Sequence, residues 1–247
     1  EQTMKHFVQE ADRIIWRGDG ETLMVQAWGN NSLRVRSSCN GTIKDTDFAL
    51  IKPAFAKADI QIDNQIARLK NGDITAVLTA IDFYDEQVGY QVYQCTLEFL
   101  NADGETVLSE ISNGGSLKLC AREFRSHLGG KHRLKASFVS NPDERLYGMG
   151  QYQQNILDIK GCLFELAHRN SQASVPFVLS DQGYGFLWHN PAIGSASFGK
   201  NKTEWIAEST EQLDYWVTIG QTPHQISAQY ADTTGHVPMM PEHGLGY

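Results

Sequence analysis

The chain has 247 residues, of which 41% are hydrophobic and 20% are charged, so it can bury a substantial core and is not a disordered chain. The formal net charge is −8 and the pI is near 5.5. This acidic balance argues against nucleic acid or an anionic membrane as the main partner.

The four cysteines, Cys39, Cys95, Cys120 and Cys162, are widely spaced. They form no CxxC pair and no Cys/His cluster, so the sequence predicts neither a disulfide framework nor a metal site. We expect four reduced, mostly buried thiols and therefore a cytoplasmic protein. The sequence contains no run of about 18 apolar residues that would indicate a membrane helix.

Short apolar runs separated by Gly and Asn turns fill the first half of the chain. Residues 22–28 and 32–37 are predicted strands, and in the second of them Arg34 and Arg36 alternate with apolar residues. This alternation predicts a half-buried strand with its basic face in solvent.

Two hairpins and a further strand are predicted next. Residues 65–70 and 73–79 flank Asn71-Gly72, a strong signal for a tight turn because both residues tolerate positive φ. Residues 96–100 and 105–110 flank a second, four-residue turn. Residues 134–140 form the strand that leads into the second half.

The densest pattern lies in residues 144–191, where glycine turns separate apolar runs about as long as buried strands. Tyr184, Phe186 and Trp188 alternate there, which favours core residues over a platform for stacking sugars. His189 is interpreted as a strand-end residue with its own hydrogen-bond partners. Strands at 193–198, 204–208 and 213–220 follow.

One helix is predicted near the C-terminus. Thr222 is a suitable N-cap, Pro223 fits the first helical position, Gln225 completes a capping box, and Gly235 ends the helix. Many short strands with one short helix predict an all-β fold, an antiparallel β-sandwich. We expect one domain over residues 1–235 and a connector over 236–247.

Several segments in this order resemble one known family. They read ERLYGMGQ, LDIKG, VPFVLSDQGYGFLWHNP, LDYWVTIG, TPHQISAQYADTTG and VPMMPEHGLGY. They are similar to the N-terminal domain of glycoside hydrolase family 31, which contains retaining α-glucosidases and α-xylosidases. The resemblance implies a galactose-mutarotase-like sandwich that leads into a catalytic (β/α)8 barrel.

The resemblance also implies a function. The whole protein would hydrolyse terminal α-linked sugars of an oligosaccharide or α-glycoside, without a cofactor. Retaining glycosidases use two carboxyl groups about 5 Å apart, and the family carries both on its barrel. We therefore expect no catalytic residue before Tyr247 and no activity from this chain alone. Its expected partners are the substrate and its own barrel, and the association of several copies stays open.

Substrate-binding residues are implied on the polar segment 168–172. The family has an Arg-Asp pair at the place of Arg169 and Asn170, on a loop over the barrel mouth. Asn170 keeps the hydrogen-bonding capacity of that aspartate but lacks its charge. Arg169 would contact sugar or pair with a barrel carboxylate, and His168 is a weaker candidate at the same rim.

Other carboxylates in the matching region show no pattern of a facing pair. Asp158, Glu165, Asp181 and Asp214 are interpreted as residues of strand ends and turns. Two alternative functions stay open at this point. One is a free-standing carbohydrate-binding or scaffold module, because a sandwich fold does not fix function. The other is a mutarotase-like catalyst, which would need a Glu/His acid–base pair in a cleft.

Overall fold

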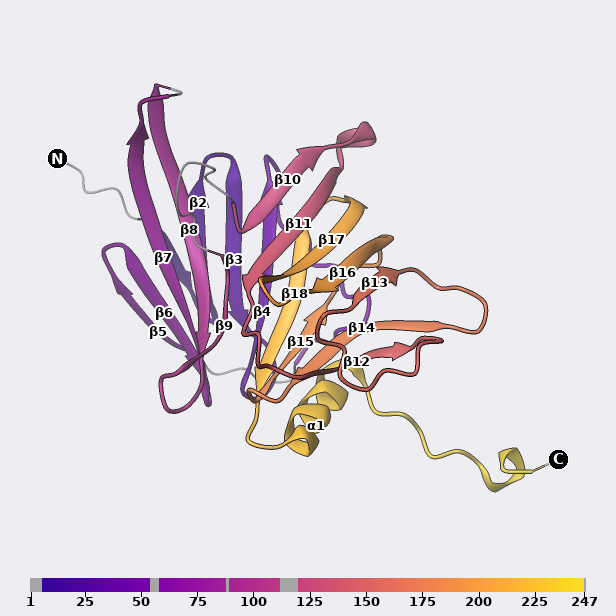
Figure 1. Ribbon diagram of the computed structural model, residues 1–247. Coiled ribbons are helices and arrows are strands. Elements are labelled where there is room, and N and C mark those ends of the chain that lie inside the picture. Colours follow the sequence, from indigo (N-terminus) through magenta and orange to yellow (C-terminus); the bar gives the residue numbers. More distant parts are fainter. Residues whose placement is uncertain (1–5, 54–57, 88, 112–119, 247) are drawn as a thin grey trace.

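The computed structural model describes residues 6–53, 58–87, 89–111 and 120–246. This part of the chain forms three antiparallel sheets, and one α-helix, α1 (Pro223–Thr234), lies near the C-terminus (Figure 1). The predicted all-β antiparallel sandwich with one short helix is confirmed. Within the described residues, no helix has the length and apolar character that crossing a bilayer requires.

The largest sheet has eight strands and draws on both ends of the chain. Its first four strands form a meander, and β18 from the C-terminal end pairs with β4 in its middle. The spatial order is β1 (Phe7–Glu10), β2 (Arg13–Gly18), β3 (Glu21–Ala27), β4 (Ser32–Cys39), β18 (Leu213–Ile219), β15 (Tyr184–Trp188), β14 (Ala173–Ser180) and β12 (Leu146–Gln151).

A five-stranded sheet covers the second half of the large sheet. Its spatial order is β10 (Arg122–Ser126), β11 (His132–Val139), β17 (Lys202–Thr210), β16 (Gly194–Phe198) and β13 (Leu163–Leu166). Stacked aromatic rings fill the space between the two layers: the Phe186 ring centroid lies 5.0 Å from those of both Trp205 and Tyr215. Tyr184, Phe186 and Trp188 are all buried, so their assignment to the core is confirmed.

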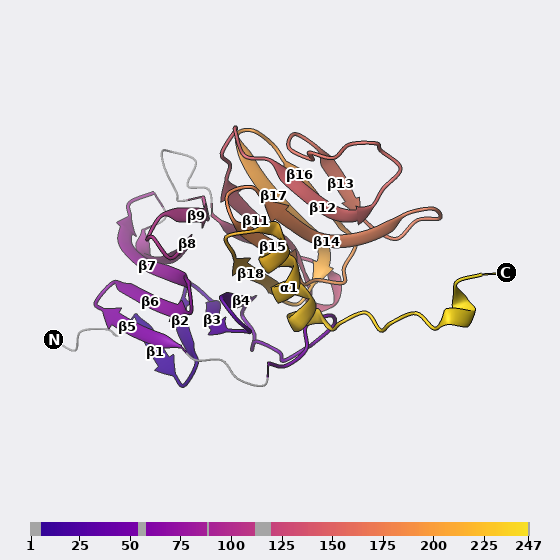
Figure 2. The same cartoon turned by 90° about the horizontal axis from the view of Figure 1, so that it is seen from below.

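The other five-stranded sheet packs beside the first half of the large sheet (Figure 2). Its order is β5 (Asp59–Asp63), β6 (Ile66–Asn71), β7 (Ile74–Asp85), β8 (Tyr90–Leu100) and β9 (Thr106–Ser109). Both predicted hairpins are present. The tight turn is shifted by one residue, because Asn71 still pairs with Ile74 and Gly72, at φ 64°, is the first turn residue. The Asn71 side chain instead donates hydrogen bonds to the carbonyls of Gly29 and Ser32.

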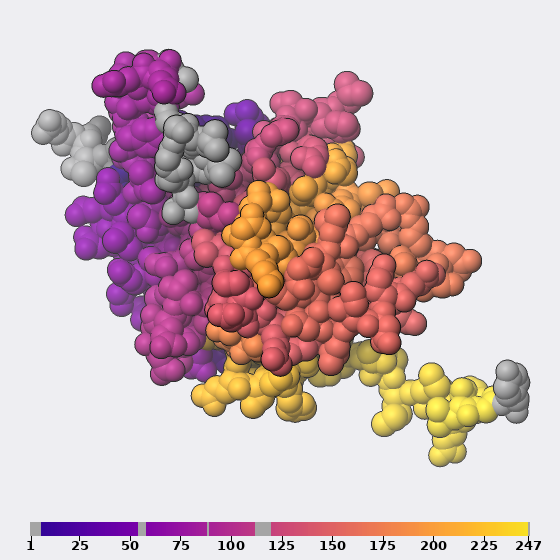
Figure 3. Space-filling model, in the orientation of Figure 1, coloured from indigo at the N-terminus to yellow at the C-terminus, as the bar shows by residue number. Residues whose placement is uncertain are grey.

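Helix α1 begins and ends as the sequence predicts. The Thr222 hydroxyl accepts a hydrogen bond from the Gln225 backbone N–H, and Gly235 ends the helix at φ 104°. The helix packs against β15 and β18, and the ring of Tyr230 stacks on Phe177 at 4.2 Å. After α1 the chain leaves the body of the molecule (Figure 3), and the apolar side chains of Val237 and Met239 are almost fully exposed.

The prediction that the four cysteines are mostly buried is wrong. Of the four, Cys95 alone is buried; Cys120 is exposed, and Cys39 and Cys162 are partly exposed. Cys120 lies beyond the end of β9 and just before β10, outside the regular strands that bury side chains.

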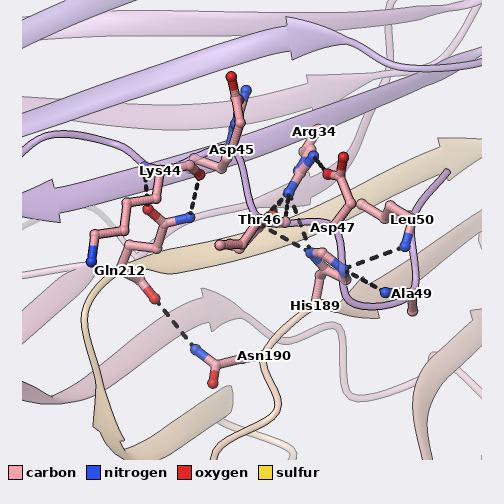
Figure 4. Close-up of polar contacts among 12 residues, drawn as sticks. Arg34, Lys44, Asp45, Thr46, Asp47, Ala49, Leu50, His189, Asn190 and Gln212 are labelled. Atoms are coloured by element: carbon pink, nitrogen blue, oxygen red, sulfur yellow. Dashed lines mark hydrogen bonds and ion pairs between the residues drawn. The ribbon is translucent and has the colours of Figure 1, made fainter. Parts of the chain in front are cut away.

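The prediction that Arg34 and Arg36 face solvent is also wrong. Both are buried, with exposed fractions of 0% and 1%. The alternation along β4 is correct, but the polar face of this strand lies under residues 40–53, which we call the covering segment (Figure 4). Arg36 pairs with Asp45 of the covering segment and donates a hydrogen bond to Gln26 of β3.

The buried charge of Arg34 is neutralised by two carboxylates. Its guanidinium binds Asp214 of β18 through two hydrogen bonds of 3.0 and 2.7 Å, and Asp47 of the covering segment through one of 2.8 Å. It also donates to the Thr46 carbonyl and lies 4.5 Å from the ring centroid of Trp28. Burial by itself would lower the pKa of Arg34, but the hydrogen bonds and charges of Asp214 and Asp47 outweigh it and raise the pKa. The ion pair therefore fastens the covering segment to the sheet.

We expect Arg34→Met to destabilise the protein strongly. Removing one partner of a buried ion pair leaves the Asp214 carboxylate uncompensated, at a cost of about 3–5 kcal/mol. Urea unfolding measures this loss. The double variant Arg34→Met/Asp214→Leu should recover much of the stability, because both charges are then absent. Lys44→Met is the control: it removes the exposed pair with Glu211 and should cost no more than about 1 kcal/mol. Equal losses for Lys44→Met and Arg34→Met would contradict this account.

We expect Tyr215→Phe to stabilise the protein. The Tyr215 hydroxyl is buried and has no hydrogen-bond partner among the described residues, so its removal relieves a desolvation cost of about 1–3 kcal/mol. Burial also raises the pKa of Tyr215 well above its usual range. Above pH ~10 the unfolded chain loses this phenolic proton and the folded chain keeps it, so wild-type stability falls as the pH rises.

Thermal unfolding between neutral pH and about pH 11 tests both effects. Tyr215→Phe should melt at a higher temperature than the wild type, and the difference should grow above pH ~10. Tyr84→Phe is the control, because the Tyr84 side chain is exposed on another sheet. A lower melting temperature for Tyr215→Phe at neutral pH would show that its hydroxyl has a partner.

Candidate functional site

The predicted substrate-binding residues lie together on one exposed loop. This loop, residues 167–172, joins β13 to β14 at the edge of the molecule, and we call it the rim loop. His168, Arg169 and Asn170 are all exposed. The structure thus brings the three candidates together on the surface.

A tight turn shapes the tip of the rim loop. The Gln172 backbone N–H donates a hydrogen bond to the Arg169 carbonyl, with Asn170 and Ser171 between them. Ser171 has a φ of 65°, in the left-handed region that few non-glycine residues adopt. No described residue forms a hydrogen bond with the Asn170 side chain, so its amide is available to a ligand.

Arg169 has a partner on β13, the strand that precedes the rim loop. Its guanidinium forms two hydrogen bonds with Glu165 of β13, at 3.1 and 2.6 Å, and both side chains are more than half exposed. The hydrogen bond from Arg169 lowers the pKa of Glu165. Because the pair is exposed, its contribution to stability is small. It does restrict the directions in which the guanidinium can point.

Tyr152 clamps the two ends of the rim loop, a role that the sequence analysis did not assign. Its hydroxyl donates a hydrogen bond to the Glu165 carbonyl at 2.7 Å and lies 2.9 Å from Ser174 Oγ. Its ring packs edge-on against Phe164 at 4.8 Å. Glu165 precedes the rim loop and Ser174 follows it, so one side chain fixes both of its anchors.

The adjoining part of β12 has an unusual backbone. Gly148, Met149 and Gly150 all have positive φ, at 122°, 72° and 87°. A Cβ at either glycine would lie within 2.4 Å of a carbonyl oxygen of β14, so only glycine fits there. The pairing of β12 with β14 is irregular at this point and resumes with Gly150 opposite Ser174. This irregularity sets the position from which the rim loop leaves β14.

A buried polar network lies at the end of β12 and β14 away from the rim loop and gathers residues from three of the recognised segments. Glu144 accepts hydrogen bonds from Ser180 and Tyr184, both at 2.6 Å, and from Lys160 at 3.0 Å. Lys160 also donates to Ser140. Burial raises the pKa of Tyr184 well above its usual range, and the nearby Glu144 carboxylate raises it further. The network joins the ends of β12, β14 and β15 that lie away from the rim loop, because Ser180 is the last residue of β14 and the rim loop enters this strand at Ala173.

The four carboxylates singled out in the sequence are each occupied by near neighbours. Asp158 accepts hydrogen bonds from the backbone N–H groups of Leu146 and Lys160, and Asp181 accepts one from Arg145. Glu165 pairs with Arg169, as described above. The interpretation as strand-end and turn residues fails for Asp214, which is buried within β18 beside Arg34.

His189 has partners on both ring nitrogens, as predicted. Nδ1 lies 3.1 Å from Asp214, and Nε2 accepts a hydrogen bond of 3.0 Å from the Ala49 backbone N–H (Figure 4). An N–H donor facing Nε2 requires a lone pair there, so the ring is the neutral tautomer with its hydrogen on Nδ1. This histidine–carboxylate pair is buried and fastens the covering segment to the sheet.

Groups of three or more His, Cys, Asp or Glu side chains that could hold a metal ion do not occur in the described ranges. The chemistry available at the rim loop is therefore hydrogen bonding and charge. An amide, a guanidinium and an imidazole next to one another can bind hydroxyl groups. They supply no nucleophile paired with a base, so the rim loop is suited to binding and not to bond cleavage.

Comparison with known proteins identifies relatives along almost the whole chain. No protein-family model matches it. An uncharacterized family 31 glucosidase of Pseudescherichia vulneris is 42% identical over 243 residues, which are 97% of this chain and 46% of that protein. An α-xylosidase of Saccharolobus solfataricus is 28% identical over 203 residues, which are 75% of this chain and 27% of that protein.

A solved structure is also similar. The family 31 α-xylosidase from a soil metagenome, determined with xylose bound, superposes with a TM-score of 0.85 at 43% identity. The match covers 97% of this chain and 36% of the xylosidase. The chain thus spans less than half the length of these relatives. It is a relative of glycoside hydrolase family 31 α-xylosidases and glucosidases, and it aligns with their N-terminal portion.

Proposed function

We propose that this chain is the N-terminal β-sandwich of a retaining α-glycosidase that removes terminal α-linked xylose or glucose. The similarity to an α-xylosidase with bound xylose, at 43% identity over nearly the whole chain, carries this proposal. The two catalytic carboxylates belong to a (β/α)8 barrel that this chain does not contain, so the sandwich packs on the barrel and supports it. The whole protein works without a cofactor, in the cytoplasm.

The domain boundary follows from the same proposal. Residues 1–235 form the sandwich, and residues 236–247 lead into the barrel. The exposed apolar side chains of Val237, Met239, Met240 and Leu245 support this, because such residues are usually covered by a partner surface. Their cover would be the barrel of the same protein.

The rim loop contributes to the substrate pocket in this proposal. Asn170 at the tip of the turn binds a sugar hydroxyl through its amide, and His168 lies at the border of the pocket. Arg169 either contacts the sugar directly or keeps its pair with Glu165 and holds the turn. The Tyr152 clamp supports this role, because a binding loop needs a rigid base.

The two alternative functions have less support. A free-standing binding module does not account for relatives that are more than twice as long as this chain. A mutarotase-like catalyst requires an accessible Glu/His pair, whereas the partner of His189 is an aspartate and both side chains are buried.

Hydrolysis of nitrophenyl α-xyloside and α-glucoside tests whether the catalytic carboxylates lie on the barrel and not on the sandwich. We expect no activity from the 247-residue chain and clear activity from the protein extended through its natural C-terminus, because only the latter holds the carboxylate pair. NMR of the released sugar should show retention of the anomeric configuration. Activity of the short chain would place the catalytic carboxylates within residues 1–247, and inversion would rule out the proposed mechanism.

Asn170→Ala in the extended protein tests the rim loop. Loss of one neutral hydrogen bond to the substrate should lower kcat/KM about three- to tenfold, which corresponds to ~0.5–1.5 kcal/mol. Asn170→Asp should raise kcat/KM above the wild-type value, because a carboxylate accepts a stronger hydrogen bond from a hydroxyl. Gln91→Ala removes an exposed amide of β8, serves as the control, and should leave kcat and KM unchanged. Unchanged kinetics in both Asn170 variants would remove this residue from the pocket.

A further inference from the structure

A hollow of about 300 Å³ opens on the surface beside the covering segment. It lies between that segment, the residues that follow β15, and the turn that joins β17 to β18. The lining residues used below are Lys44, Phe48, Asn190, Thr210, Glu211 and Gln212. We propose that this hollow, which we call the Phe48 hollow, binds the ring of a neutral pyranose sugar.

The polar wall of the Phe48 hollow is rigid. The Gln212 side chain makes two hydrogen bonds with the backbone of Lys44, donating to its carbonyl and accepting from its N–H. The Asn190 amide donates to the Gln212 carbonyl at 3.3 Å (Figure 4) and to the Thr210 hydroxyl at 3.0 Å, and its oxygen accepts from the Ala192 backbone N–H. Because these amides are already held in place, a ligand would not have to order them on binding.

One side of the hollow is aromatic. Phe48 is 62% exposed, and its ring is held beside His189, with 5.7 Å between the ring centroids. The flanking backbone is fixed, because the Ala49 N–H is bound to His189. The face of an aromatic ring carries negative charge density. The C–H groups on one face of a pyranose are weakly positive, so they stack well on such a ring.

The charges around the hollow favour a neutral ligand. Asp214 is neutralised by Arg34, and Lys44 is paired with Glu211 at 2.6 Å. This exposed pair offers a donor and an acceptor side by side, which suits two neighbouring hydroxyls of one sugar. Lys131 is the remaining cation of the lining, and on its own it makes a weak site for an anion.

The size of the hollow agrees with this ligand class. Small-molecule sites span roughly 300–1,000 Å³, and the Phe48 hollow, at about 300 Å³, lies at the lower end of that range. A single sugar ring with its hydroxyls is a ligand of this size class. The hollow shares no residue with the rim loop, so the inference does not depend on the proposed function of that loop.

Saturation-transfer NMR and titration calorimetry on the 247-residue chain test the proposal, with methyl α-xyloside and methyl α-glucoside as probes. We expect millimolar binding. Phe48→Ala should weaken it at least about tenfold, equivalent to ~1.4 kcal/mol, because the stacking surface is lost. Phe48→Trp should preserve binding with a larger aromatic face. Phe48 is exposed, so these changes should leave the fold intact, which circular dichroism checks.

Two matched variants locate the binding. Tyr84→Ala removes another aromatic side chain of similar exposure, 61%, and should leave the affinity unchanged. Asn170→Ala should also leave it unchanged. The proposal is overturned by the absence of saturation transfer to the folded chain, by equal binding in Phe48→Ala, or by loss of binding in Asn170→Ala. Tighter binding of glucuronate than of the neutral probes would overturn the ligand class. Hydrolysis by the extended protein is measured separately, so neither proposal depends on the outcome of the other.

Discussion

A single buried guanidinium determines how the N-terminal and C-terminal parts of this molecule fit together. Arg34 stands on β4, where the N-terminal meander meets β18, and its charge requires compensation from both sides. Asp214 supplies it from the last strand, and Asp47 supplies it from the covering segment. The covering segment has almost no regular structure, so side-chain contacts hold it to the sheet. This attachment buries His189 and forms one wall of the Phe48 hollow.

The second organising feature is the Glu144 network, at the end of β14 away from the rim loop. Burying a carboxylate and an ammonium is costly unless both are well hydrogen-bonded, and here every partner comes from a different turn or strand end. Such a network stabilises only one arrangement of β12, β14 and β15. At the other end of β14, Tyr152 gives the exposed rim loop a rigid base, which suits the binding role proposed for Asn170.

The sequence predicted local features well and long-range features poorly. Turn chemistry located both hairpins and the capped helix, and alternation placed Phe186 and Trp188 in the core. The same alternation misjudged Arg34 and Arg36, because a two-residue period separates two faces of a strand but cannot show what covers each face. The role of Tyr152 had no local signal, because its partners depend on how β13 and β14 pack.

The irregular pairing of β12 with β14 has a consequence for how this region tolerates changes in length. Between the pairs Gly148–Val178 and Gly150–Ser174, β12 advances by two residues while β14 covers four. Leu146 and Met149 are both buried although they stand three positions apart, so the alternation of faces along β12 is interrupted at the irregularity. Pro176, which lacks a backbone N–H, lies in the longer step, where the ladder does not require that donor. Where β14 pairs regularly with β15, from Phe177 to Leu179, deleting one residue would turn every following side chain to the opposite face. The irregular step already lacks a continuous ladder, so an inserted or deleted residue disrupts less pairing there.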